Sequence, residues 1–143
     1  MRRVFESHVR VPYAHVDRMN FVYYAHYYLY FEMARSELLR AAGLPYAQLE
    51  ESGVILPVVS SGCEYRKPAH YDDWLTLHSQ CQWQGARLRI DYTVRRDTER
   101  LAIGYTVHVC MSSDGKVLRP PEALVASLSL EPFEPPRKRS DHP

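Results

Sequence analysis

The sequence contains no apolar run that approaches the roughly 18 residues of a membrane-spanning helix. Arg2 and Arg3, near its start, are not followed by the apolar stretch of a signal peptide. It has only three cysteines, which lie far apart and include no CxxC pair, so neither a disulfide framework nor a zinc site is expected. These absences predict a protein of the cytoplasm, without an integral membrane segment and without a bound metal.

Neither sign of charge is in excess. The formal net charge is +1 over 143 residues, so no strong electrostatic field attracts nucleic acid, and we expect no nucleic-acid partner. The one basic cluster, Arg137-Lys138-Arg139, lies near the C-terminus. The length fits one domain. We predict that residues 1–130 form this domain and that residues 131–143 form a proline-rich, basic and mobile tail.

The spacing of apolar residues predicts two helices and then a series of strands. From Ala25 to Ala42 apolar residues recur at steps of three and four, and Gly43 is a natural residue to end that helix. A shorter helix is expected over residues 45–52. The remaining pattern predicts strands over residues 3–11, 54–65, 74–84, 87–95 and 101–111, and a last short helix from Pro120 through Leu128.

The predicted strand over residues 101–111 has two different faces. One face carries large apolar residues such as Ile103, and the other carries small or polar residues such as Gly104 and His108. We expect His108 to be a hydrogen-bonded core residue. An apolar helix and an antiparallel sheet bury each other if the sheet wraps around the helix, which favours an α+β fold with one central helix. The open edges of such a sheet predict at least a dimer, joined edge to edge.

Asp17 lies in a loop shortly before the long helix. A loop aspartate commonly accepts hydrogen bonds from nearby backbone amides, and this alone explains many of them. A carboxylate near a helix N-terminus also has free backbone N–H groups and the positive end of the helix dipole as neighbours. A thioester carbonyl requires donors for its developing oxyanion and a nucleophile or base nearby. Asp17 and the start of the helix can supply both.

Three stretches of the sequence carry motifs that occur together in one family. The first is Tyr13-x-x-x-Asp17-x-x-x-x-Val22-Tyr23-x-x-His26-Tyr27, followed by Phe31-Glu32-x-Ala34-Arg35. The second is Tyr65-Arg66-x-Pro68-Ala69-x-Tyr71-Asp72-Asp73-x-Leu75, and the third is Ile103-Gly104-x-Thr106-x-His108-Val109 with Asp114-Gly115-Lys116. In order and spacing they resemble the 4-hydroxybenzoyl-CoA thioesterase family, including its Tol-Pal-associated acyl-CoA thioesterases, from residue 5 to around residue 128.

The resemblance implies a hotdog fold and an acyl-CoA thioesterase without a metal or redox cofactor, because coenzyme A is part of the substrate. Asp17 matches the family's catalytic aspartate, which acts as nucleophile or general base. Tyr24 matches the position whose backbone N–H polarises the thioester carbonyl. Many members have glycine where this chain has Asn20, a residue that tolerates left-handed backbone. Many also have histidine and asparagine where this chain has Tyr24 and His26, so His26 is either an alternative base or a packing residue.

The resemblance also implies a pocket for acyl-CoA. We expect Tyr13, Val22 and Tyr27 to line it. The phosphates of CoA require basic groups at its mouth, and Arg66 and Arg87 are candidates near strand ends. The identity of the acyl group stays open, as does the choice between a homodimer and a homotetramer.

Two other functions are compatible with the same residues. A hotdog enoyl-CoA hydratase or dehydratase pairs a histidine with an acidic residue, and His26 and Glu32 are both present. A non-catalytic module that binds acyl-CoA or an acyl carrier would bind thioesters without turning them over, and only the basic tail favours it.

Overall fold

The computed structural model of the chain describes residues 4–44 and 46–129, so the predicted tail lies outside the described residues. Five antiparallel strands form the main sheet, in the order β1-β4-β5-β6-β3. They are β1 (Phe5–Arg10), β3 (Val58–Tyr65), β4 (Trp74–Gln84), β5 (Arg87–Arg96) and β6 (Glu99–His108). A smaller sheet contains β2 (Val54–Ile55), β7 (Cys110–Ser112) and β8 (Val117–Leu118). The helices are the short 3-10 turn η1 (Tyr13–His15), α1 (Ala25–Ala41), α2 (Tyr46–Glu51) and α3 (Glu122–Ser129).

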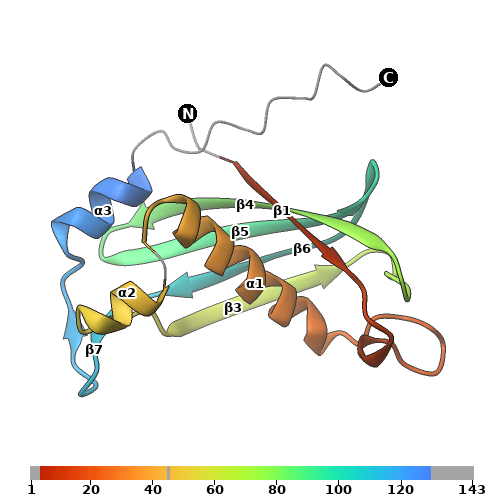
Figure 1. Ribbon diagram of the computed structural model, residues 1–143, viewed down its shortest axis with the longest axis horizontal. Helices are drawn as coiled ribbons and strands as arrows, with labels where there is room; N and C mark the ends of the chain where they lie inside the picture. The colour runs from red at the N-terminus through yellow and green to blue at the C-terminus, as the bar shows by residue number, and fades with distance from the viewer. Residues whose placement is uncertain (1–3, 45, 130–143) are drawn as a thin grey trace.

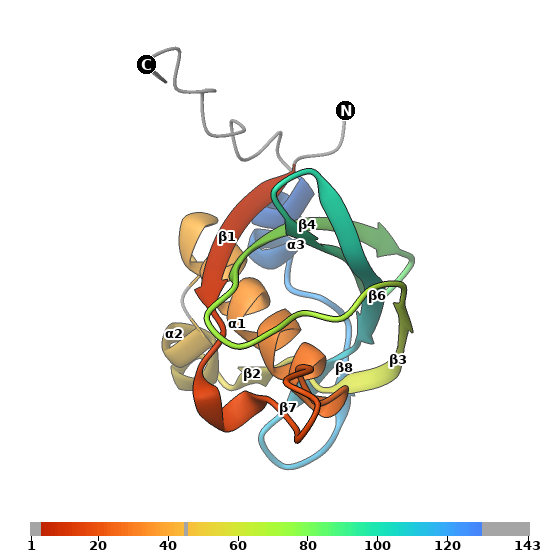
Figure 2. The ribbon, with the colours of Figure 1, turned by 90° about the vertical axis from the view of Figure 1, so that its right-hand side faces the viewer.

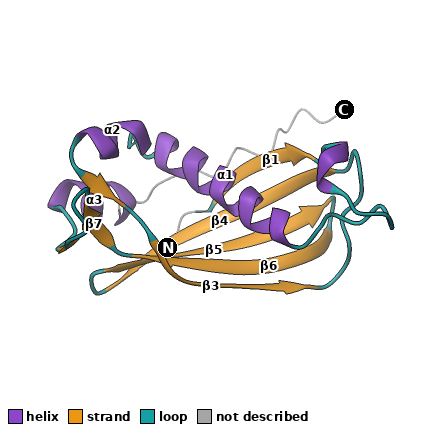
Figure 3. Cartoon of the chain, turned by 90° about the horizontal axis from the view of Figure 1, so that it is seen from below, coloured by secondary structure: helices purple, strands orange, loops and turns teal. Residues whose placement is uncertain are grey.

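The long helix α1 lies across one face of the main sheet (Figure 1). Viewed nearly along the helix, the strands curve around it (Figure 2), and from below the sheet forms one layer against it (Figure 3). The buried residues of α1 recur at helical spacing and are Tyr27, Tyr30, Phe31, Ala34, Leu38 and Leu39. The helix begins at the predicted residue, and the sheet wraps around it as the sequence predicts.

The start of α1 lies at the end of the sheet where β5 connects to β6. The Val22 amide, just before the helix, donates to the Ala69 carbonyl oxygen at 2.8 Å. Beside Ala69, the Pro68 carbonyl oxygen accepts a hydrogen bond from Arg96, the last residue of β5, at 3.3 Å. The loops before α1 and before β4 therefore meet at this end of the sheet.

The helix packs on the small-residue face of β6 and not on its large-residue face. Phe31 stacks against Tyr92, with ring centroids 4.5 Å apart and an angle of 10° between the rings. A Cβ added at Gly104 would lie 2.6 Å from the Phe31 ring and 2.8 Å from the Gly62 carbonyl oxygen. Glycine at this position thus allows an aromatic ring of α1 to rest directly on the sheet.

Gly104→Ala is expected to lower the free energy of unfolding by about 1–3 kcal/mol, because the added methyl group would overpack a contact with a buried ring and with backbone. Gly62→Ala is the matched control. The three atoms nearest to its Cβ would all belong to the Tyr105 side chain, the first at 2.7 Å, and that ring is partly exposed and can turn away. Urea denaturation of both variants measures the difference, and an equal loss in the two would contradict the special role of Gly104.

A chain of buried polar groups crosses the core. Thr106 Oγ1 lies 2.7 Å from the Tyr92 hydroxyl and 2.8 Å from His108 Nε2, while His108 Nδ1 lies 2.9 Å from the Leu56 carbonyl oxygen. These contacts suit a neutral imidazole whose Nδ1–H donates to Leu56 and whose Nε2 accepts from Thr106. Burial lowers the pKa of His108 to about 4, although the bond to Leu56 opposes the shift. The predicted hydrogen-bonded core histidine is confirmed.

This buried histidine makes stability depend on pH. In the unfolded chain His108 takes up a proton near its ordinary value of 6.5, whereas the folded residue stays neutral down to about 4. The unfolded state therefore binds more protons within this window, and stability falls as the pH falls, by about 3 kcal/mol for this group. Urea denaturation at a series of pH values measures the slope. His108→Gln, which does not titrate, should have a shallower slope, and an unchanged slope would contradict the prediction.

The helices and the cysteines can be compared with the expectations from the sequence. Within residues 4–44 and 46–129, no helix is both long and apolar enough to cross a membrane. All three cysteines, Cys63, Cys81 and Cys110, lie in this part of the chain, and none of them forms a disulfide bond.

Candidate active site

A short hairpin-like loop joins η1 to α1 and carries Asp17 near its tip. Val16 and Val22 form an isolated antiparallel bridge, and the Asp17 amide donates to the Phe21 carbonyl oxygen at 2.8 Å. Asn20 has a φ of 63°, and its amide donates to the Asp17 carbonyl oxygen at 3.0 Å. Asparagine accepts this left-handed backbone more readily than most residues, so the turn forms without the glycine of the family pattern.

The Asp17 carboxylate is exposed and is held in one orientation by its own loop. Its Oδ1 accepts hydrogen bonds from the Met19 amide at 2.9 Å and from the Phe21 amide at 3.1 Å. The side chain borders a hollow of about 590 Å³ whose wall is formed by Tyr13, Val16, Asp17, Arg18 and Asn20. The local hydrogen bonds expected of a loop aspartate are therefore present, and the same bonds fix the carboxylate at the edge of a hollow.

The start of α1 has open backbone donors. Tyr24 is the N-cap residue, in helical geometry (φ −54°, ψ −33°), and no side chain caps the helix there. The amides of His26 and Tyr27 donate to the carbonyl oxygens of Tyr23 and Tyr24, at 2.9 and 3.2 Å. Among the described residues, the amides of Tyr24 and Ala25 have no acceptor. These two N–H groups lie at the positive end of the helix dipole and can bind an anionic oxygen.

A second hollow, of about 370 Å³, lies beside the first turn of α1. Its lining is mostly aromatic or apolar, with two cations, and consists of Phe21, Val22, Tyr24, Tyr27, Tyr65, Arg66, Lys67 and Pro68. The Tyr65 hydroxyl donates to the Tyr24 carbonyl oxygen at 3.3 Å, which ties β3 to the helix start. The structure thus brings together Val22, Tyr24, Tyr27 and Arg66 of the predicted site residues, while Tyr13 borders the hollow at Asp17.

The two hollows flank the same loop. Val16 and Asp17 border the first hollow, and their bonded partners Val22 and Phe21 border the second. Asp17 and Tyr24 therefore border different hollows, which are joined by one short loop.

The structure does not bring Arg87 to this end of the sheet. Arg87 pairs with Gln84 beside the β4–β5 turn, whereas Arg96, at the other end of β5, reaches the loop beside α1. A strand of 10 residues spans about 30 Å, at roughly 3.3 Å per residue. Within one chain, Arg87 therefore does not lie beside Arg66, and a role for Arg87 in binding CoA stays a prediction.

The sequence motifs did not identify Arg96 as part of this region. Its guanidinium forms ion pairs with Asp73 at 2.7 Å and with Glu99 at 3.0 Å. Glu99 also pairs with Lys67 at 2.8 Å, which holds the loop before β4 against the β5–β6 turn. Because Lys67 and Asp73 are distant in the chain from Arg96 and Glu99, no local spacing in the sequence indicates the network.

His26 is not directed at a substrate hollow but stacks on His15, with ring centroids 4.2 Å apart. His15 Nδ1 lies 2.9 Å from the Tyr30 hydroxyl. Burial and the neighbouring His26 lower the pKa of His15. Nothing in the sequence indicates this contact, since η1 and α1 meet only because of the intervening loop.

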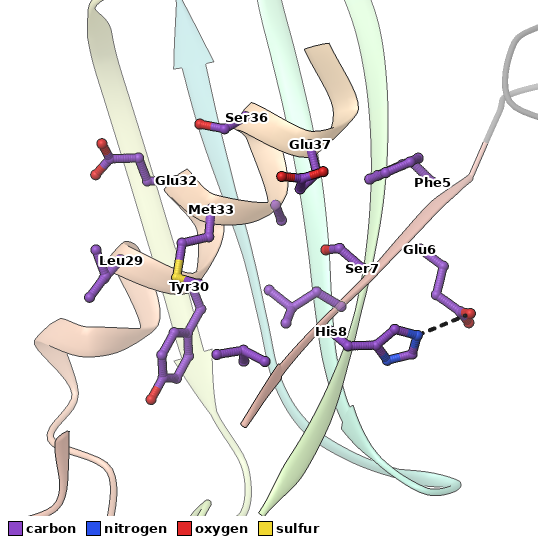
Figure 4. Close-up of a pocket in the computed structure, with 13 residues that line it drawn as sticks. Phe5, Glu6, Ser7, His8, Leu29, Tyr30, Glu32, Met33, Ser36 and Glu37 are labelled. Carbon is purple, nitrogen blue, oxygen red and sulfur yellow. Dashed lines mark ion pairs between the residues drawn. The ribbon is translucent and has the colours of Figure 1, made fainter. Parts of the chain in front are cut away.

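A third hollow, of about 500 Å³, lies between α1 and β1 and contains none of the predicted site residues. Figure 4 shows Leu29, Glu32 and Met33 on the helix, and Glu6 and His8 on the strand β1 beside it. Glu32 therefore lines a different hollow from Tyr24.

Comparison with known proteins identifies the family. The sequence model of the thioesterase-like superfamily matches residues 11–128. A Bacillus subtilis protein named "Putative acyl-CoA thioesterase YneP" is 30% identical over 113 residues, which cover 78% of this chain and 82% of that protein. A Synechococcus elongatus protein named 1,4-dihydroxy-2-naphthoyl-CoA hydrolase is 26% identical over 118 residues, which cover 80% and 87%.

Among solved structures, the hypothetical protein TT1821 from Thermus thermophilus matches with a TM-score of 0.83 and 34% identity, covering 87% of this chain and 96% of that one. The structural likeness confirms the predicted α+β hotdog fold. From its sequence and its fold, this chain belongs to the thioesterase-like superfamily.

Proposed function

We propose that the protein is an acyl-CoA thioesterase that hydrolyses an acyl-CoA to a free acid and CoA. The observation that carries this proposal is an exposed, oriented carboxylate on the loop that leads into the uncapped start of α1. In this proposal the Tyr24 amide donates to the thioester carbonyl oxygen, and Asp17 acts on the carbonyl carbon. Membership of the superfamily and the names of the two relatives support thioester hydrolysis.

Two chemical courses fit Asp17. As a nucleophile, its carboxylate attacks the carbonyl carbon, the carbon–sulfur bond breaks, CoA leaves as a thiolate, and water then hydrolyses the mixed anhydride. As a general base, it removes a proton from the water that attacks the same carbon. In both courses the negative charge that develops on the carbonyl oxygen is stabilised by the helix amides. Neither course uses a cofactor.

The second hollow is the proposed site of the acyl group. Its aromatic rings suit a planar acyl group, in keeping with the naphthoyl compound named for the Synechococcus relative and with the resemblance to 4-hydroxybenzoyl-CoA thioesterases. Arg66 and Lys67, at its border, are proposed to meet the CoA phosphates. Arg66 also faces Glu64 at 3.8 Å, and both side chains are largely exposed, so the guanidinium can turn toward a phosphate.

We also propose a homo-oligomer that joins at β3 and works in the cytoplasm. β3 is an edge strand of the main sheet, and Val58, Val59 and Tyr65 on it are exposed. A second copy paired with this edge would cover these residues and would border the hollow to which Tyr65 and Arg66 contribute.

The test of the proposed function is a panel of acyl-CoAs, including benzoyl-type, naphthoyl-type and short aliphatic ones, assayed for release of the free CoA thiol. Thiol release from at least one of them is expected. Hydration of an enoyl-CoA without thiol release would support the hydratase instead. In the structure, however, Glu32 lines the hollow between α1 and β1, whereas His26 stacks on His15. Tight binding without turnover of any thioester would support the non-catalytic module.

A further inference from the structure

Two histidine rings lie behind the loop that carries Asp17. His15 ends η1 on one side of the loop, and His26 is in the first turn of α1 on the other side. The rings stack with centroids 4.2 Å apart and an angle of 21° between them. His15 also bonds to the Tyr30 hydroxyl, one turn further along α1, at 2.9 Å. The ring of His15 therefore contacts the helix at two successive turns.

The backbone of His15 makes a third connection to the helix start. Its carbonyl oxygen accepts the Tyr23 amide at 2.9 Å, immediately before the Val16–Val22 bridge closes the loop. Asp17 lies inside the segment that is closed by these contacts. A shift of the His15 ring would therefore change the position of the Asp17 loop relative to the helix amides.

The hydrogen bond between His15 and Tyr30 favours a neutral His15 ring. Tyr30 is fully buried, and burial, followed by the nearby Tyr27, raises the pKa of its hydroxyl, so the hydroxyl keeps its proton and needs an acceptor. The lone pair of His15 Nδ1 is the acceptor within reach. A protonated His15 would have an N–H at that atom, and the Tyr30 hydroxyl would lose its acceptor.

Within residues 4–44 and 46–129, no acidic side chain forms an ion pair with either ring. In the described residues, His26 Nδ1 is buried without a hydrogen-bond partner. The groups that face the pair are the rings of Tyr23, at 6.2 Å from His26, and of Tyr30, at 5.6 Å from His15. A cation on one histidine would thus face the other histidine and two neutral phenols.

We propose that His15 and His26 are positioning residues that hold the Asp17 loop against the start of α1 only while both rings are neutral. This inference rests on the proposed function of Asp17. Loss of the pair by protonation would let the loop move and would lower activity, since a displacement of about 1 Å at a reacting group can cost about 10²-fold in rate.

The pH at which this happens follows from the direction of the pKa shift. Burial and His26 lower the pKa of His15 from its ordinary value of 6.5. The folded state therefore binds fewer protons than the unfolded state just below that value, and the cluster loses stability as the pH falls below 6.5. Above that pH the His15 ring is neutral and the loop is held.

The test compares a variant that keeps the aromatic contact but cannot carry a charge with variants that remove the His15 ring. His26→Phe keeps an aromatic ring against His15 but cannot be protonated, so it should retain kcat at high pH. Because the charge of His26 no longer lowers the pKa of His15, the acid limb of the kcat profile should shift to higher pH. His15→Ala should lower kcat by about tenfold or more at high pH, with little change in KM. His15→Asn, whose amide oxygen can accept the Tyr30 hydroxyl in place of Nδ1, should recover part of that loss.

His8→Ala, on the strand β1 and remote from the loop, is the matched control and should leave the profile unchanged. A His26→Phe variant with an unshifted acid limb, or a His15→Ala variant with normal kcat, would overturn the proposal. Thermal denaturation of each variant excludes simple unfolding as the cause.

NMR tests the pair without activity. The His15 ring should titrate below pH 6.5, and the Met19 and Phe21 amides should shift with it. If the wild-type protein released no thiol from any acyl-CoA but the loop amides shifted with the His15 titration, the proposed function would be wrong and the positioning role of the two histidines would be supported. Titration of His15 without a shift of the loop amides would contradict that positioning role.

Discussion

Replacing Asp17 with asparagine is expected to lower kcat for thioester hydrolysis by about 10²–10⁴-fold without unfolding the protein. The Asn side chain keeps an oxygen that can accept the Met19 and Phe21 amides, so the turn that orients residue 17 should survive. What it lacks is the negative charge, and with it both the nucleophile and the base. Stopped-flow or continuous assay of thiol release against a good substrate measures the effect.

Asp97→Asn is the matched control for this substitution. Asp97 is exposed in the β5–β6 turn with a φ of 55°, a geometry that asparagine adopts readily, so activity should not change. Asp17→Ala removes the charge and the loop hydrogen bonds together, and it should be at least as slow as Asp17→Asn. An Asp17→Asn enzyme with wild-type kcat would remove this carboxylate from the mechanism.

The second large effect on kcat is expected from removing the backbone N–H of Tyr24. Tyr24→Pro deletes the amide N–H that is proposed to stabilise the oxyanion, and the φ of −54° at this position already fits proline. The expected loss in kcat is about 10²–10³-fold, the usual effect of removing one oxyanion donor. Tyr24→Ala keeps the N–H and removes only the exposed side chain, so it should retain most of the activity.

The contrast between these two variants decides the role of the amide. Proline also restricts the residue before it, so circular dichroism and thermal denaturation must show that the Tyr24→Pro protein is folded. Retention of kcat by the folded proline variant would contradict the proposed donor. An equal loss in the alanine variant would assign the effect to the tyrosine side chain.

Much of the fold could be predicted because it depends on local patterns. Steps of three and four residues, ended by Gly43, predicted α1 to within one residue of its end at Ala41. Clean alternation predicted β4 and β5 almost completely. The face of β6 that packs on the helix could not be chosen in this way. That choice depends on the ring of Phe31, which reaches Gly104 only in the folded chain.

The candidate site could be predicted in part for the same reason. The motif around Asp17 and Tyr24 is continuous in sequence, and the loop and the helix start lie where its spacing indicates. The distance of Arg87 from Arg66 could not be predicted, because it depends on the β4–β5 hairpin, which places the start of β5 at the far end of the sheet. The stack of His15 on His26 could not be predicted, since it depends on how the loop between them turns.

The uncapped start of α1 sets a trade-off between robustness and catalysis. A serine or aspartate at an N-cap typically stabilises a helix by about 1 kcal/mol, because its side chain satisfies the first amides, and this chain has an exposed tyrosine there instead. In the proposed enzyme, those amides are reserved for a substrate oxygen. Selection for heat resistance alone would favour a capping residue at position 24, and the more durable protein would be the slower catalyst.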